Sequence, residues 1–336
     1  MPNDGRLFSM VVPVMNEEVV IRDTYAKLTR TLEGVGMSFE VVVVDNGSTD
    51  STPAIMAELC AADPRWKFVR LSRNFGYQNS ITAGMSAASG DAIMVIDADL
   101  QDPPGLIPAF IAKWREGYDV VYGVREKRTG ESFLRVMPTM AAMRLISWMS
   151  DEVKLPLHSS DFRLITRRVR DAYAQLPEKT RYVRGMIHWL GFKQVGIPYI
   201  RLGRELGESK VNLFYLINFM FNALFNFSVR PLRLFSIMGA GLIALTAVLG
   251  TAYLGAWVFS TPPTGVTSIL MLLLINLGVM SLGIGVLGEY LSKVYSEVKG
   301  RPLWLVDYTL NLEDPAVGRI DPLLTAQAGR PADRAA

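Results

Sequence analysis

The chain is poor in the residues from which disulfides and histidine metal sites are built. Its 336 residues include one cysteine, Cys60, and two histidines, His158 and His188. A single cysteine excludes an internal disulfide and suits a reducing compartment, while two histidines argue against a histidine-built zinc site. The charge is balanced, because 35 basic and 32 acidic residues leave a net charge of +3. This balance argues against a nucleic-acid-binding protein.

Charge is missing altogether from one long stretch. Residues 234–288 contain no Asp, Glu, Lys, Arg or His, which predicts two transmembrane helices, about 234–258 and 266–288, each close to the roughly 20 residues needed to cross a bilayer. Spans without ionisable residues argue against a channel. Arg230 and Lys293 are among the basic residues that flank the pair, so the positive-inside rule places both flanks in the cytoplasm. Because residues 1–10 lack a basic start and a long apolar core, no signal peptide is expected there.

Up to residue 123 the chain alternates between apolar runs and amphipathic stretches. Apolar runs bounded by Gly, Pro or Asp predict strands, and the spacing of apolar residues over 17–32 predicts a helix. Strands separated by helices of this length predict an α/β fold with a largely parallel sheet. The predicted strands are 7–12, 39–44, 67–71, 92–96 and 119–122.

Changes in composition divide the chain into four segments. An α/β domain is expected over 1–210, and within it the helical stretch 134–149 is either a packing helix or a helix resting on the bilayer. Asparagines recur every fourth residue on an otherwise apolar pattern in 211–229, which predicts an interfacial juxtamembrane helix. The two transmembrane helices occupy 230–292, and a cytoplasmic tail is expected over 293–336.

An acidic run follows the predicted strand 92–96. It contains Asp97, Asp99 and Asp102, and such a run after a buried strand places carboxylates at the carboxyl edge of a sheet, where α/β folds bind ligands. Carboxylates so close together repel, and Mg²⁺ or Mn²⁺ commonly holds such groups beside a substrate phosphate. Polar residues also follow the three preceding strands, among them Asn16 and Asp45. The pattern predicts a metal-dependent site for a phosphorylated substrate.

These motifs together resemble a known family. The segments at 12–18, 44–50 and 73–76 look like those of the inverting family 2 glycosyltransferases of GT-A fold, a Rossmann-like mixed, mainly parallel sheet. The segments at 97–104, 161–164 and 207–210 are similar to the polyprenyl-phosphate branch, which includes dolichol-phosphate mannose synthase and the bactoprenol glucosyltransferases. The resemblance covers about residues 8–300. Small departures are Asn46, Gly105 and Val211, where the family commonly has Asp, Glu and Tyr.

The resemblance implies a role for each matching residue. Asp161 is ambiguous, because it either orients the acceptor or Arg163 in the site or forms a structural Asp–Arg pair, whereas Asp102 is expected to begin the Pro-Pro turn. The implied metal ligands for Mg²⁺ or Mn²⁺ are Asp97, Asp99 and Gln101; the nucleotide-sugar site is Pro13, Asn16, Glu17, Asp45, Arg73 and Asp97; the catalytic set is Asp99, Asp161 and Arg125; and the acceptor-phosphate site is Arg128, Arg201, Arg204, Ser209 and Lys210.

The implied reaction is inverting transfer of a sugar from a nucleotide-diphosphate sugar to polyprenyl (undecaprenyl) phosphate at the bacterial inner membrane. Glucose from UDP-glucose is the first choice, with UDP-GlcNAc, GDP-mannose and an aminoarabinose donor behind it. Expected partners are the membrane, a flippase and further copies of the chain through small-residue faces of the spans, but no nucleic acid. Two alternatives are a catalytically silent protein that binds nucleotide sugar and recruits a flippase, and a polysaccharide synthase. The second lacks support, because Arg65-Trp66 is not preceded by the Gln of that group's motif.

Overall fold

The chain divides into two compact units. A computed structural model describes residues 5–126, 159–201, 230–259 and 265–312. The sheet unit comprises Met1–Gly130, Leu155–Glu208 and Arg301–Ala336, and the helical unit comprises Glu131–Lys154 and Ser209–Gly300. The stretch 134–149 and the predicted interfacial helix 211–229 lie outside the described residues.

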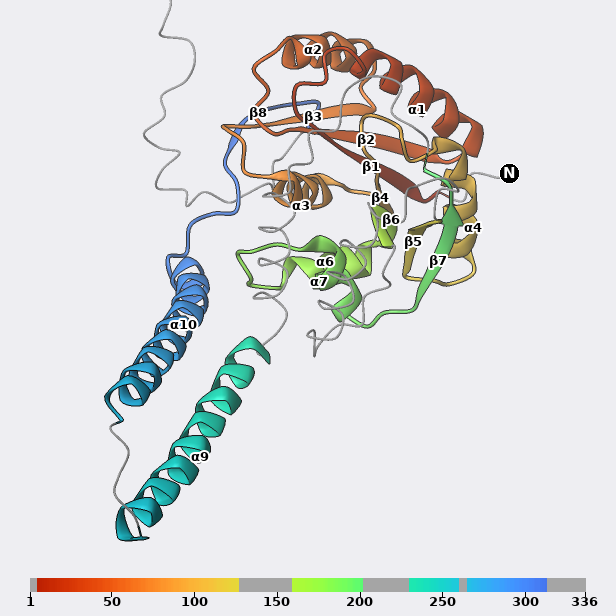
Figure 1. Ribbon diagram of the computed structural model, residues 1–336. Coiled ribbons are helices and arrows are strands. Elements are labelled where there is room, and N and C mark those ends of the chain that lie inside the picture. Colours follow the sequence, from red (N-terminus) through yellow and green to blue (C-terminus); the bar gives the residue numbers. More distant parts are fainter. Residues whose placement is uncertain (1–4, 127–158, 202–229, 260–264, 313–336) are drawn as a thin grey trace, which may run out of the picture. The chain divides into compact units, whose positions relative to one another are not determined.

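The sheet unit is built on one eight-stranded sheet in the order β7-β5-β6-β4-β1-β2-β3-β8 (Figure 1). Neighbours β1–β2, β1–β4, β2–β3 and β5–β7 run parallel, whereas β4–β6, β5–β6 and β3–β8 run antiparallel. The expected mixed, mainly parallel α/β sheet is therefore confirmed. The strands are β1 Leu7–Val14, β2 Ser38–Asp45, β3 Trp66–Leu71, β4 Ala92–Val95, β5 Val120–Arg125, β6 Ser159–Thr166, β7 Gln194–Tyr199 and β8 Val306–Leu310.

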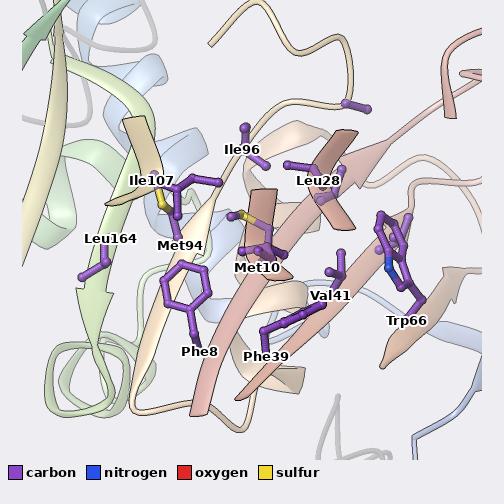
Figure 2. Close-up of a cluster of buried hydrophobic side chains, with 14 of the residues drawn as sticks. Phe8, Met10, Leu28, Phe39, Val41, Trp66, Met94, Ile96, Ile107 and Leu164 are labelled. Carbon is purple, nitrogen blue, oxygen red and sulfur yellow. The ribbon is translucent and has the colours of Figure 1, made fainter. Parts of the chain in front are cut away.

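Helices cover both faces of this sheet, as its doubly apolar strands require. Alternate residues of each strand enter different cores: Met10 and Val12 pack with α1 and α4, whereas Val11 packs with α3 and α7. Figure 2 shows the first core, where Leu28 of α1 lies beside the β1 and β2 side chains. The helices are α1 Ile21–Val35, α2 Thr52–Ala62 and α4 Ile107–Arg115 on one face, with α3 Tyr77–Ala87, α6 Arg167–Ala174 and α7 Val183–Trp189 on the other.

Three strands were not foreseen from the sequence. β6 enters the sheet between β4 and β5 in the antiparallel direction, β7 extends the edge beyond β5, and β8 adds to the opposite edge beyond β3. β8 lies in the segment expected to be a tail. It is anchored by Trp304, which is 8% exposed, and by Asn311, whose side chain donates to the Cys60 and Trp66 carbonyls at 2.7 and 2.8 Å.

The described part of the helical unit contains two long helices. α9 spans Arg230–Phe259 and α10 spans Val266–Val298. The two helices touch where Gly283 faces the Phe235 ring, since a Cβ at this glycine would overlap the ring. Among the described residues, Ile275–Val298 is the helical segment that is long and apolar enough to cross a membrane, and Ile237–Ala252 is a shorter apolar segment. The expectation of two transmembrane helices stays a prediction.

A buried carboxylate ties the amino-terminal edge of the sheet together. Glu40 of β2 is 3% exposed. It accepts from Ser9 Oγ at 2.5 Å, Lys67 Nζ at 2.5 Å and the Ser89 backbone N–H at 2.6 Å. Burial alone would raise the pKa of Glu40, but these hydrogen bonds hold it below its ordinary value. The ionised carboxylate therefore stabilises the fold at neutral pH.

We expect Glu40→Gln to lower the melting temperature of the detergent-solubilised protein at pH 7 by about 5–10 °C, because it leaves Lys67 unpaired, a change of about 3 kcal/mol. Stability that depends on a depressed carboxyl pKa is lost as the pH falls through that pKa, so the difference from wild type should shrink in scans below about pH 4.5.

The matched control is Glu116→Gln, which breaks the exposed ion pair with Lys113 and should shift the melting temperature by about 1 °C or less. A Glu40→Gln protein as stable as wild type at pH 7 would contradict the assignment.

Candidate active site

The predicted site residues that the structure describes lie at the carboxyl edge of the sheet, where the parallel strands end. Parallel strands β1 to β4 end there, and so do β5 and β7. The antiparallel strands β6 and β8 begin there instead, because each runs against its neighbour. This edge is where open α/β sheets bind ligands.

The loops after β1 and β2 hold each other through side chains. Asn16 donates its backbone N–H to Ser48 Oγ at 2.9 Å and accepts from the Thr49 N–H at 2.8 Å. The Glu17 N–H donates to Thr52 Oγ1 at 2.9 Å. Asn16 has a positive φ of 57°, a conformation that asparagine tolerates better than most residues. The predicted pocket residues Asn16 and Glu17 thus shape the loop that would receive a nucleotide.

Asp45, at the end of β2, is a fully buried carboxylate with one unsatisfied oxygen. Its Oδ1 accepts from the Ser48 hydroxyl and from the Ser48 N–H at 2.9 Å. Its Oδ2 has no hydrogen-bond partner among the described residues, and the nearest charge is Arg70 Nε at 3.8 Å. Burial raises the pKa of Asp45 above its ordinary value. A buried oxygen without a partner is rare in a folded protein and fits a ligand N–H.

The loop after β3 packs closely against the end of β2. Asn46 donates from its side chain to Asn74 Oδ1 and accepts the Phe75 N–H, both at 2.9 Å. The Asn46 side chain thus links the ends of β2 and β3 as both a donor and an acceptor. Gly47 has a φ of 78°, and a Cβ there would come within 2.7 Å of the Arg73 backbone. Arg73 itself is exposed and stacks over the Phe75 ring at 4.0 Å.

The acidic run after β4 lies against basic and hydroxyl groups. Asp97 accepts from the Tyr77 hydroxyl at 2.5 Å, and its second oxygen faces Arg201 at 3.6 Å. Burial, followed by the charges of neighbouring carboxylates, raises the pKa of Asp97 to about 6. Asp99 accepts from the Gln101 N–H at 3.2 Å. Between them, Leu100 has a positive φ of 48°, an outlier for a bulky residue and of the kind that clusters at functional sites.

Asp102 belongs to this charged group, although the sequence pointed only to a turn. It is 1% exposed and accepts from the Tyr199 hydroxyl at 2.5 Å. Arg125 lies 3.8 Å from its Oδ2 and Arg201 lies 3.5 Å from its Oδ1. The structure therefore places Arg125, predicted as catalytic, and Arg201, predicted to bind the acceptor phosphate, beside a carboxylate that sequence reasoning set aside. The sequence feature that could have indicated this role is the position of Asp102, three residues after Asp99 in the same segment after β4.

Asp161, near the start of β6, is paired with a residue that the sequence did not single out. Arg184 of α7 donates from Nε to Asp161 Oδ1 at 3.2 Å and from Nη2 to Asp161 Oδ2 at 2.7 Å. Burial would raise the pKa of Asp161, but Arg184 holds it below its ordinary value. Arg163, the partner suggested from the sequence, donates instead to the Ser160 carbonyl at 2.9 Å. The Asp161–Arg163 pairing is therefore corrected to Asp161–Arg184.

The residues of the acidic run suit a hard divalent cation. Carboxylate and amide oxygens are the ligands that Mg²⁺ and Mn²⁺ prefer, and Asp97 is crowded by the charges of Asp99, Asp102 and Asp161. Within the described ranges, no group of three or more His, Cys, Asp or Glu side chains is placed to hold a metal. A cation here would complete its shell with water or substrate phosphate, as Mg²⁺ commonly does.

The predicted site residues fall into two groups. Pro13, Asn16, Glu17, Asp45 and Arg73 lie on or beside the ends of β1, β2 and β3, whereas Asp97, Asp99, Gln101, Arg125, Asp161 and Arg201 lie around the ends of β4 to β7. Arg128, Arg204, Ser209 and Lys210 lie outside the described residues. Sequence reasoning missed Tyr77 of α3, Arg184 of α7 and Tyr199 of β7, whose contacts with Asp97, Asp161 and Asp102 form only when these elements pack together.

Comparison with known proteins assigns the chain to a family. The sequence model described as "Glycosyl transferase family 2" matches residues 9–184. The uncharacterized glycosyltransferase YkcC of Bacillus subtilis is 42% identical over 317 residues, which cover 93% of this chain and 97% of that protein. The SfII prophage-derived bactoprenol glucosyl transferase of Shigella flexneri is 35% identical over 299 residues, covering 89% and 96%. A crystal structure of mannosyl-3-phosphoglycerate synthase from Rubrobacter xylanophilus covers 68% of this chain and 74% of its own, with a TM-score of 0.49 and 19% identity.

The family match and the full-length relatives agree with the mixed, mainly parallel sheet and with the motifs at its carboxyl edge. The chain therefore belongs to glycosyl transferase family 2, and its sheet unit has a GT-A-like fold.

Proposed function

We propose that the protein transfers a sugar from a nucleotide-diphosphate sugar to polyprenyl phosphate, with inversion at the anomeric carbon. The observation that carries the proposal is the match to a relative named bactoprenol glucosyl transferase, which extends over 89% of the chain and so well beyond the family domain at 9–184. Polyprenyl phosphate supplies a lipid-linked acceptor, and the long apolar helices after the sheet unit suit an enzyme that works at a membrane.

The donor we propose is UDP-glucose. Asp45 supports a nucleotide pocket after β1 and β2, because its buried Oδ2 is free to accept an N–H from the base. A base edge offers such a donor beside its carbonyl groups, as uracil does at its ring N–H. Asn16 and Glu17 lie in the neighbouring loop, which is hydrogen-bonded to Ser48 and Thr52, and Arg73 follows β3.

A Mg²⁺ or Mn²⁺ ion held by Asp97, Asp99 and Gln101 would neutralise charge on the departing diphosphate. Arg125 and Arg201 lie beside Asp102, and guanidinium groups of this kind bind phosphate oxygens. The acceptor phosphate is already anionic at neutral pH, so the reaction does not require a general base. Asp161 fits this scheme as a positioning residue, since both its oxygens are taken up by Arg184.

The order of the strands supports an even number of membrane crossings. β7 and β8 belong to the same sheet, yet α9 and α10 lie between them in sequence. An even number of crossings would let the segment that joins β7 to β8 leave and return on the same side of a membrane, which favours two spans over one. Two spans formed by α9 and α10, with the sheet unit in the cytoplasm of a bacterium, satisfy this constraint and the positive-inside rule.

The proposal includes assembly of several copies through these helices, with a flippase as a further partner. No described atom lies within 4 Å of a Cβ built at Gly239, Gly241, Gly278, Gly285 or Gly288. Such small residues let transmembrane helices approach closely.

We expect membranes containing the protein to transfer label from UDP-[¹⁴C]glucose to undecaprenyl phosphate in the presence of Mn²⁺ or Mg²⁺, and chelation with EDTA to abolish transfer. Asp99→Asn should lower the rate about 100-fold or more, because it weakens the metal and diphosphate site. Extraction of the lipid fraction and scintillation counting measure the product.

The matched control is Asp23→Asn, which removes an exposed carboxylate that pairs with Lys27 on α1 and should leave the rate unchanged. Failure of a panel of nucleotide sugars to label the lipid would overturn the proposed function. Full activity of Asp99→Asn would overturn the metal assignment alone.

We further expect Asp102→Asn to lower kcat/KM for the lipid acceptor about 10- to 100-fold with little change in donor affinity, because Arg125 and Arg201 lose the carboxylate between them. Asp63→Asn is the control, since Asp63 is also buried and paired with an arginine. It precedes β3 and so lies at the amino-terminal end of the parallel strands, away from the proposed site. Equal losses in the two variants, each with wild-type melting temperature, would argue against a site role for Asp102.

A further inference from the structure

Arg70 connects the nucleotide pocket to the last strand of the chain. It lies on β3 with its side chain 27% exposed. Its Nη2 donates to the Ser48 carbonyl at 3.2 Å. Its Nε lies 3.8 Å from Asp45 Oδ2 and 3.7 Å from Asp307 Oδ2, which are ion-pair distances too long for hydrogen bonds. Arg70 Nε thus lies at ion-pair distance from two carboxylates, one on β2 and one on β8.

Asp307 reaches Arg70 because β8 is irregular at this residue. Arg70 is in register with Tyr308 and Leu71 with Val306, so the register shifts between them and Asp307 has no partner across the ladder. A bulge of this kind re-aims a side chain and is common beside active sites. The ring of Tyr308, the next residue on β8, has its centroid 5.8 Å from the Arg70 guanidinium carbon and packs against this group.

We propose that Asp307 is a positioning residue of the nucleotide pocket, which holds the Arg70 guanidinium back from Asp45 so that Asp45 Oδ2 stays free for the base. The inference rests on the proposed function, because it takes Asp45 to be the base-binding carboxylate. Without Asp307, nothing on β8 balances the attraction between Arg70 and Asp45. Arg70 then closes onto Oδ2, makes a hydrogen bond with it and competes with the nucleotide.

The position of β8 in the chain adds a consequence. It begins eight residues after Val298, where α10 ends. β8 therefore follows α10 closely in sequence. A chain cut before β8 would lose Asp307 while keeping the whole family domain at 9–184.

The test uses the full-length protein in detergent. Isothermal titration calorimetry measures binding of UDP, GDP and CDP with Mn²⁺ to wild type, Asp307→Asn, Arg70→Met and the double variant. We expect Asp307→Asn to weaken nucleotide binding roughly tenfold. In the Arg70→Met background the same change should have no further effect, because Asp307 acts only through Arg70. The KM for the donor should rise in Asp307→Asn, while kcat and the KM for the acceptor stay within about twofold.

Two variants separate positioning from folding. Asp307→Glu keeps the charge and should bind nucleotide like wild type, and Tyr308→Phe keeps the ring and serves as the matched change on the same strand. If Asp307→Asn lowers the melting temperature, Asp307→Ala gives the same comparison in the Arg70→Met background.

The outcomes distinguish the inference from the function. Unchanged nucleotide affinity in Asp307→Asn, or additive effects of Asp307→Asn and Arg70→Met, would overturn the inference and leave the proposed function standing. Wild type that binds no nucleoside diphosphate and transfers no sugar would overturn the proposed function and the inference with it.

Discussion

The desolvation of carboxylates at one edge of the sheet is the constraint on which the site depends. Asp45, Asp97 and Asp102 share one arrangement: Oδ1 accepts from a hydroxyl, that of Ser48, Tyr77 or Tyr199 respectively. The Oδ2 of each faces an arginine at 3.6–3.8 Å, beyond hydrogen-bond distance. Asp45 and Asp102 are buried, and each keeps an Oδ2 without a hydrogen-bond partner among the described residues, whereas the Asp97 side chain is 25% exposed.

The mixed sheet makes this arrangement possible. Strands β1 to β4 bring the acidic residues to the edge, and the basic partners of Asp97 and Asp102 come from later parts of the sheet unit. β5 and β7 carry Arg125 and Tyr199 to the same edge, and Arg201 follows β7. The antiparallel β6 places Asp161 there at its start, within reach of Arg184 on α7. The countercharge for Asp97, Asp102 and Asp161 therefore comes from β5, from the segment after β7 and from α7, whereas the antiparallel β6 adds a further carboxylate.

The parts that were predictable from the sequence are those encoded locally. Strands β1 to β5, helix α1 and the acidic run after β4 follow from apolar periodicity and from Pro, Gly and Asp at strand ends. The strands β6 and β8 depend on pairing with distant segments, and β8 is separated from its neighbour β3 by the whole helical unit. No local pattern marks Arg184 as the partner of Asp161, because that pairing exists only once β6 and α7 are packed together.

Ion-pair distances separate the carboxylates that are free to bind a ligand from those that are not. Asp161 and Asp63 are each bound by an arginine at 2.7–2.8 Å, with hydrogen bonds to both carboxylate oxygens. Asp45 and Asp102 instead keep a buried Oδ2 without a hydrogen-bond partner among the described residues. The arginines that face these two oxygens also have other partners: Arg70 lies 3.7 Å from Asp307, and Arg125 donates to the Tyr199 hydroxyl at 3.2 Å. Each guanidinium has a second partner, whereas the Oδ2 that it faces has no hydrogen-bond partner among the described residues, so this oxygen is the one left to accept a hydrogen bond.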